Sequence, residues 1–227
     1  MSYRIFPAGD AALTIELGRQ IDLETNRRVH HLASVLARAR LPGTGEAVPA
    51  YASLLVHYDP AILDYAAVER WVEANLSQFD AAPAPEPRRV DIPTVYGGSY
   101  GPDLESLAND HHISVETAIR LHSSAVYTVY MMGFTPGFPY LGGLPDELAT
   151  PRLETPRTRV PAGSVGIAGS QTGIYPIDSP GGWQIIGYTP VHLFIPDREA
   201  PTLLAAGDQI RFIPISIQDL HDASPDT

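Results

Sequence analysis

The stretch that decides the fold runs from Met131 to Tyr188 and reads MMGFTPGFPYLGGLPDELATPRLETPRTRVPAGSVGIAGSQTGIYPIDSPGGWQIIGY. It holds eleven of the chain's 19 glycines and eight of its 22 prolines, with short apolar runs between them. Glycine and proline fix turn geometries, and brief strands between frequent turns are typical of a closed β-barrel. Aromatic rings between such turns predict a shaped apolar concavity; they are Phe134, Phe138, Tyr140, Tyr175 and Trp183.

The residues before this stretch show a different pattern. Residues 1–80 alternate strands and helices, with helices expected from Asp22 to about Arg40 and from about Asp64 to Gln78. Such an order predicts a small α+β domain in which helices cover one face of an antiparallel sheet. Residues 81–87, AAPAPEP, are typical of a stiff linker.

Residues 88–220 predict a second, mainly β domain. A strand is expected over Arg88–Tyr96, two short helices over Asp103–Asn109 and Ser114–His122, and short β segments to about Ile217. Residues 221–227 are expected to form a frayed tail.

Composition excludes several classes of function. The chain has 227 residues, 44% of them hydrophobic, which indicates a globular protein with a substantial core. Its formal charge of −11 argues against nucleic acid and against anionic membrane surfaces. No apolar run approaches membrane-spanning length and the N-terminus lacks a signal-peptide layout, so we expect a cytoplasmic protein.

Two residue types are missing altogether. Without cysteine there is no disulfide, thiolate nucleophile or zinc–sulfur site. All 15 basic residues are arginine, so there is no P-loop lysine, no Schiff-base lysine and no lysine that can carry biotin. The adjacent pairs His30-His31 and His111-His112 point apart, and we expect no metal site.

Residues 97–101, GGSYG, fit the G-x-S-x-G pattern of a nucleophile elbow around Ser99. A serine hydrolase also needs a histidine base, a carboxylate and an alternating βα fold, which the second domain lacks. We therefore favour a glycine-rich turn that leads into a helix.

Polar groups without charge define the candidate site. Gln171 and Thr172 offer an amide and a hydroxyl that suit a neutral lactam or ureido ligand. His122 shares a helix face with apolar residues, so it points at the core or at a pocket wall. A buried neutral histidine is the commoner case, and a catalytic acid or base is the alternative. We expect His122, Gln171 and Thr172 to line one polar patch, with Phe134 and Phe138 as its apolar wall.

Three arginines between prolines, Arg152, Arg157 and Arg159, predict a rigid cationic rim that can bind a carboxylate or phosphate. Pairing with the nearby Glu154, Glu147 and Asp146 is the alternative. Arg157, Arg159 and the ring of Tyr175 complete the expected set of substrate-binding residues.

Several long motifs carry a family resemblance. GFTPGFPYLGGLP, RVPAGSVGIAGSQTGIYP and SPGGWQIIG, with FPAGDAALTIEL near the start and GDQIRFIPIS near the end, resemble the family of the 5-oxoprolinase B subunit. The same family is called allophanate hydrolase subunit 1 and Kip-type kinase inhibitor. The resemblance implies a cyclophilin-like barrel and a role in an ATP-dependent enzyme that opens the 5-oxoproline lactam to L-glutamate.

The resemblance also implies partners. The A subunit of that enzyme and a homologous C-type subunit would complete the complex, ATP would be bound mainly by other subunits, and this chain would be inactive alone. One alternative is an allophanate hydrolase-like or biotin-dependent carboxyltransferase half-enzyme, with biotin on another chain. A regulatory inhibitor of a sensor histidine kinase is the other. The sequence departs from the family pattern at Tyr188 and Ile195, where related chains usually carry Arg and Asp, so its substrate can differ.

Overall fold

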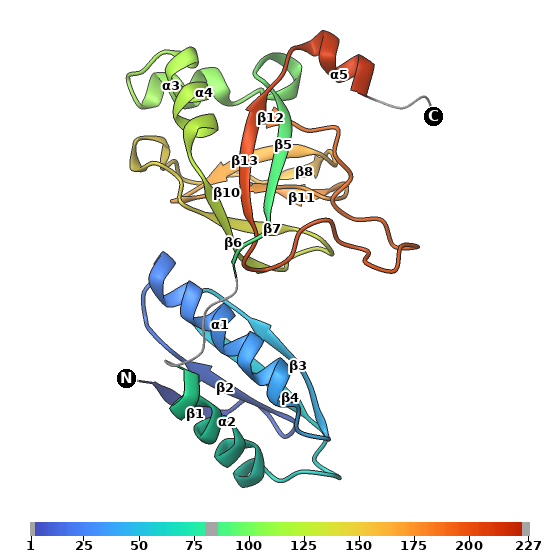
Figure 1. Ribbon diagram of the computed structural model, residues 1–227. Coiled ribbons are helices and arrows are strands. Elements are labelled where there is room, and N and C mark those ends of the chain that lie inside the picture. The colour runs from blue at the N-terminus through green and yellow to red at the C-terminus, as the bar shows by residue number, and fades with distance from the viewer. Residues whose placement is uncertain (1–2, 80–85, 224–227) are drawn as a thin grey trace. The chain divides into compact units, whose positions relative to one another are not determined.

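The computed structural model describes residues 3–79 and 86–223 (Figure 1). The chain divides into two compact units, Met1–Pro87 and Arg88–Thr227. Residues 81–85 of the expected linker lie outside the described residues.

The first unit holds a four-stranded antiparallel sheet in the order β1-β2-β4-β3. Its elements along the chain are β1 (Arg4–Pro7), β2 (Ala12–Glu16), α1 (Leu23–Ala39), β3 (Thr44–Pro49), β4 (Ser53–Tyr58) and α2 (Tyr65–Phe79). The carboxylate of Asp22 accepts a hydrogen bond from the Thr25 amide and so begins α1.

Alternation along the strands gives this sheet one apolar face. Leu13 and Ile15 of β2 and Leu54 and Val56 of β4 are buried in one core with residues of α1 and α2. Successive strand residues point to opposite faces, so Thr14 of β2 and its neighbours on either side in β1 and β4 face away from the helices.

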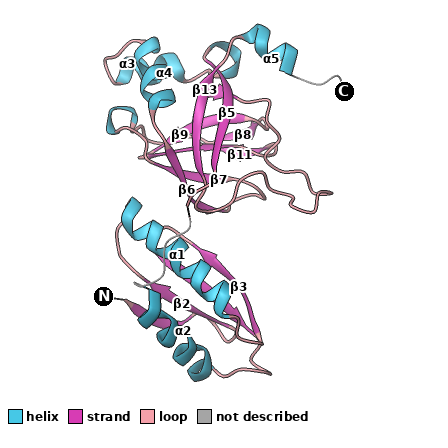
Figure 2. Cartoon of the chain, viewed as in Figure 1, coloured by secondary structure: helices cyan, strands magenta, loops and turns pink. Residues whose placement is uncertain are grey.

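The second unit is built on a closed seven-stranded barrel in the order β10-β7-β6-β13-β5-β12-β9. Figure 2 shows the strands of this unit in magenta. The prediction of a mainly β barrel is confirmed. Its strands are β5 (Arg89–Tyr96), β6 (Tyr127–Met132), β7 (Pro139–Gly142), β9 (Ser164–Ala168), β10 (Gln171–Ile174), β12 (Gln184–Tyr188) and β13 (Gln209–Pro214). The first and last of these, β5 and β13, run parallel, and the other pairs are antiparallel.

An ion pair holds the start of β5 to the segment before β13. Arg88 donates hydrogen bonds to the carboxylate of Asp208 and to the carbonyl of Leu203. Asp208 is 7% exposed and also accepts from the Ala205 amide. The junction between first and last strands is therefore tied by side chains as well as by the sheet.

Two helices close one end of the barrel. These are α3 (Leu104–Asp110) and α4 (Val115–Ser124), which lie together at the same end (Figure 1). Buried residues of both helices join the barrel interior in one apolar cluster. The Ser114 hydroxyl accepts from the Thr117 amide and begins α4.

A two-stranded ribbon, β8 (Arg157–Val160) with β11 (Ser179–Gly181), contributes to a second apolar cluster. This outer aromatic cluster contains Phe138, Tyr175 and Trp183 with aliphatic neighbours from β8, β9 and β12. Short 3-10 helices occupy Gly98–Tyr100 and Asp146–Leu148.

The chain ends differently from the expected tail. A helix, α5 (Ile217–Ala223), extends past residue 220, and residues 224–227 lie outside the described part. Ser216 and Asp219 exchange hydrogen bonds, each side chain accepting from the other's amide. This reciprocal pair is a capping box, which is a sequence signal for the start of a helix. The prediction of a frayed tail from residue 221 overlooked this signal.

Candidate functional site

His122 lies at the centre of a hydrogen-bonded network inside the barrel. Its Nδ1 is 2.8 Å from the Tyr96 hydroxyl and its Nε2 is 3.0 Å from Oγ1 of Thr172. The Thr172 hydroxyl donates to the Gly166 carbonyl. The imidazole also stacks against Phe212 at a centroid distance of 4.4 Å. The side chain is wholly buried.

The hydrogen-bond directions assign one tautomer of His122. Because Thr172 gives its only proton to Gly166, its oxygen must accept from Nε2–H of His122. Nδ1 is then an acceptor for the Tyr96 hydroxyl. Burial lowers the pKa of His122 to about 3 and raises the pKa of Tyr96 well above its ordinary value. A neutral imidazole with both nitrogens occupied is favoured here over an acid or base open to substrate.

Strand geometry corrects the expectation of a single polar patch. Gln171 and Thr172 are consecutive residues of β10, so their side chains point to opposite sides of the sheet. Thr172 pairs with Ile167 of the barrel interior, whereas Gln171 pairs with Ala168 of the outer aromatic cluster. His122 and Thr172 are thus brought together, and Gln171 is separated from them.

Phe134 is the exposed member of the aromatic set. Its side chain is 60% exposed, and its ring meets that of Phe138 edge-on at 5.6 Å. Its φ of 65° lies in the left-handed region, which costs a non-glycine residue on the order of 1 kcal/mol or more. An exposed aromatic ring held in a strained backbone indicates a binding role more strongly than a packing role.

The other predicted aromatic residues pack underneath Phe134 and are less exposed. Phe138 and Tyr175 are each 1% exposed and meet edge-on at 5.2 Å, so neither ring can touch a ligand directly. Tyr140 is half-buried and contacts the rings of Phe138 and Trp183. Of this aromatic set, the ring of Phe134 is therefore the part that a ligand can reach most readily.

The arginine rim is occupied by carboxylates distant in sequence. Nη2 of Arg157 donates to Asp103 at 2.7 Å, and Nη1 donates to the Trp183 carbonyl. Arg159 pairs with Asp178, whose carboxylate also accepts from the Ala162 amide. The alternative of paired arginines is the better description, although the partners differ from the acidic residues next to them in sequence.

The two ion pairs predict unequal contributions to stability. Asp103 is 13% exposed in its side chain and also accepts from the Ile185 amide, so Arg157→Ala leaves a partly buried carboxylate unpaired. We expect a loss of about 2 kcal/mol in the free energy of unfolding. Arg159→Ala is the matched control, because its pair is mostly exposed and should contribute under about 1 kcal/mol. Denaturant titration of both variants measures the difference, and equal losses would contradict this assignment.

The G-x-S-x-G segment has a structural explanation. Ser99 is exposed on the 3-10 helix Gly98–Tyr100. A Cβ on Gly101 would lie 2.1 Å from the Ile186 carbonyl oxygen, so only glycine fits there. His122 is occupied by Tyr96 and Thr172 and is not available as a base for Ser99.

Sequence patterns gave no indication of two partner residues. Tyr96 and Asp103 complete the His122 and Arg157 interactions from positions 26 and 54 residues away. Tyr188, a departure from the family pattern, packs its ring 5.4 Å from that of Tyr100. The other departure, Ile195, is half-buried and donates its backbone amide to Pro201.

Within residues 3–79 and 86–223, no three acidic or histidine side chains gather as a metal site. Over the same residues, none of the helices combines the length and apolarity needed to cross a membrane.

The fold of this chain also occurs in a larger protein of known structure. The crystal structure of Kluyveromyces lactis urea carboxylase matches with a TM-score of 0.74 over 97% of this chain and 22% of that chain, at 21% identity. The two chains therefore share their fold. The chain belongs to the family "Carboxyltransferase domain, subdomain C and D", which matches residues 3–204. The family predicted from the sequence motifs is confirmed.

Several relatives match between about two thirds and nearly all of this chain. The B subunit of Bacillus subtilis 5-oxoprolinase is 44% identical over 96% of this chain and 95% of its own length. That of Haemophilus influenzae is 55% identical over 63% of this chain and 64% of its own length. The conserved uncharacterized protein PH0987 from Pyrococcus horikoshii matches with a TM-score of 0.58 and 44% identity, over 96% of this chain and all of its own.

A longer relative contains the same fold as a part. The crystal structure of TTHA0988 matches with a TM-score of 0.79 and 40% identity over 90% of this chain. This chain spans only 40% of the TTHA0988 chain.

Proposed function

We propose that this chain is the B subunit of an ATP-dependent 5-oxoprolinase complex that opens the lactam of 5-oxoproline to L-glutamate. The observation that carries the proposal is the 44% identity to the B subunit of Bacillus subtilis 5-oxoprolinase, which covers nearly all of both chains. The proposed partners are the A subunit and a C-type subunit of the same complex, with ATP bound mainly by these partners.

The geometry of the second unit supports the proposal that this chain contributes only part of an active site. The only histidine proposed for catalysis is buried and neutral, and the G-x-S-x-G serine has a structural context. What the second unit offers is the exposed ring of Phe134, packed on Phe138 of the outer aromatic cluster, with Tyr140 and Gln171 half-buried on the same outer face of the barrel. We propose that this outer face forms an apolar wall and an amide contact for the lactam, and that reactive groups come from the partners.

A carboxyltransferase-type half-enzyme is the second candidate. The Emericella nidulans protein named putative urea carboxylase is 27% identical over 96% of this chain, which matches 21% of that protein. Because this chain contains no lysine, biotin would have to be attached to another chain.

Reconstitution tests both candidates. The chain is co-expressed with candidate A-type and C-type partners, and glutamate release from 5-oxoproline is measured with and without ATP. We expect ATP-dependent release from the assembled complex and none from the chain alone. Turnover of urea or allophanate with biotin carrier, and none of 5-oxoproline, would favour the carboxyltransferase and overturn the first proposal.

Phe134→Ala should lower turnover in the assembled complex by about tenfold or more, since it removes the exposed part of the wall. It should leave the free energy of unfolding within about 1 kcal/mol of the parent, because loss of exposed apolar area costs little. Ile62→Ala is the matched control: Ile62 is 64% exposed and lies in the first unit. Unchanged steady-state kinetics for Phe134→Ala would remove this ring from the site.

A further inference from the structure

A groove opens on the face of the first sheet that α1 and α2 do not cover. It has a volume of about 400 Å³ and lies over β1, β2 and the start of β4. Strand alternation places Arg4, Phe6, Thr14 and Glu16 on this face, opposite the buried Leu13 and Ile15. The segment 18–21 after β2 forms another wall of the groove.

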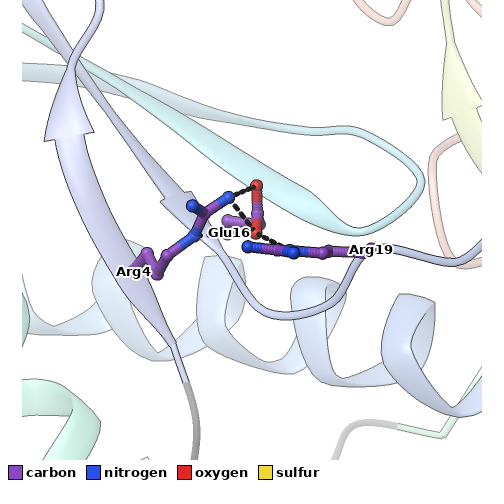
Figure 3. A network of polar contacts seen from close by, with 3 residues as sticks. All are labelled: Arg4, Glu16 and Arg19. Atoms are coloured by element: carbon purple, nitrogen blue, oxygen red, sulfur yellow. Dashed lines mark hydrogen bonds and ion pairs between the residues drawn. The ribbon is translucent and has the colours of Figure 1, made fainter.

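Two guanidinium groups share one carboxylate in this groove (Figure 3). Arg4 donates to Glu16 through Nε at 3.0 Å and through Nη2 at 2.6 and 2.7 Å. Nε of Arg19 stands 3.7 Å from the same carboxylate. Among the described residues, no hydrogen bond engages Nη1 of Arg4 or either Nη atom of Arg19. The groove therefore keeps one uncompensated positive charge, in a chain whose formal charge is −11.

Apolar surface adjoins these donors. Phe6 is 40% exposed and Ile21 is 57% exposed, and both line the groove. Phe6 pairs with Thr14, two residues along each strand from the Arg4–Glu16 pair. A ligand can therefore place an anionic group on the arginines and an apolar group on the neighbouring rings and methyl groups at the same time.

The charge balance selects the kind of anion. A single negative charge neutralises the excess of the groove, whereas a dianionic phosphate leaves the groove with a net negative charge. The free Nη groups present N–H donors in the planar fork that matches a carboxylate.

We propose that this groove binds a monoanionic carboxylate that carries an apolar group. The ligand chemistry is shared by a free small molecule and by the C-terminus of a polypeptide, and the experiment separates the two sources. The proposal stands apart from the 5-oxoprolinase assignment, since the groove belongs entirely to the first unit.

The test uses the full chain and follows backbone amide NMR shifts and titration calorimetry. The first probe is N-acetyl-L-leucine, with the neutral N-acetyl-leucine amide as its control. The second is a short peptide that ends in leucine, with a free or an amidated C-terminus. We expect saturable shifts at Arg4, Phe6 and Ile21 with a carboxylate probe and none with the amides, weakening as salt rises.

Variants make the test specific. Arg4→Gln and Arg19→Gln should each weaken binding by about fivefold or more, whereas Glu16→Gln should strengthen it by freeing both guanidiniums. Arg211→Gln is the matched control, because Arg211 is 54% exposed and paired with Asp91, and Arg4 is 55% exposed. Binding of only the free acid identifies a small molecule, and binding of only the peptide identifies a polypeptide. Failure of both acids to bind, equal binding of the amides, or unchanged binding by the Arg4 and Arg19 variants would overturn the proposal.

Discussion

Replacement of His122 by alanine is expected to lower the free energy of unfolding by about 3–5 kcal/mol. The change opens a cavity beside Phe212, leaves the Tyr96 hydroxyl without its acceptor and removes the donor to the Thr172 oxygen. Chemical denaturation of the variant, followed by circular dichroism, measures the loss. A variant as stable as the parent that has lost turnover in the assembled complex would instead support the catalytic alternative.

The same residue predicts a pH dependence. The pKa of His122 is about 3 when folded and near the ordinary value of 6.5 when unfolded, so the unfolded chain takes up the proton first. The stability from this residue is fully present above pH 6.5 and falls by about 1.4 kcal/mol per pH unit down to about pH 3. His122→Ala should lose this slope, and His192→Ala, which alters an exposed histidine, should keep it. Parallel slopes in all three proteins would contradict the buried neutral assignment.

Gly101→Ala is expected to prevent the barrel from forming or to destabilise it by about 3 kcal/mol or more. The added Cβ would stand 2.1 Å from the Ile186 carbonyl oxygen and 2.7 Å from the Gly97 nitrogen, both backbone atoms that the sheet holds in place. Soluble expression and thermal unfolding measure the effect.

Neighbouring substitutions serve as controls for Gly101. Gly98→Ala meets nothing within 4 Å and is strained only by its φ of 55°, so it should cost about 1 kcal/mol. Ser99→Ala should change neither stability nor turnover. A folded Gly101→Ala protein together with an inactive Ser99→Ala complex would restore the nucleophile elbow as an explanation.

Local sequence patterns predicted the strands of the barrel and the inward orientation of the His122 side chain. Its apolar neighbours at helical spacing indicated that it faces inward, and the structure places it among Tyr127, Phe212 and Thr172. The glycine-rich stretch likewise indicated the barrel. These features depend on spacing within one element, which the sequence displays directly.

Two expectations were wrong, one about neighbouring residues and the other about residues far apart in the sequence. Gln171 and Thr172 were expected to share one polar patch, but they are consecutive residues of a strand, and its alternation divides them. Asp103 reaches Arg157 from the N-terminal end of α3, whereas the sequence predicted a free cationic rim, with pairing to acidic residues nearer in sequence as the alternative. The pairing of Arg157 with Asp103 does not follow from separation along the chain, because the barrel's closure decides it.

That closure also sets an order of events during synthesis. The first barrel strand, β5, has β13 as its parallel neighbour through six residue pairs, and β13 is the last strand of the chain. A ribosome adding roughly 5–20 residues per second completes the intervening segment only on the order of ten seconds later. For that interval β5 presents an open edge to other nascent chains and to chaperones. Residues 1–87, whose sheet pairs only within itself, can fold while the barrel is still being made.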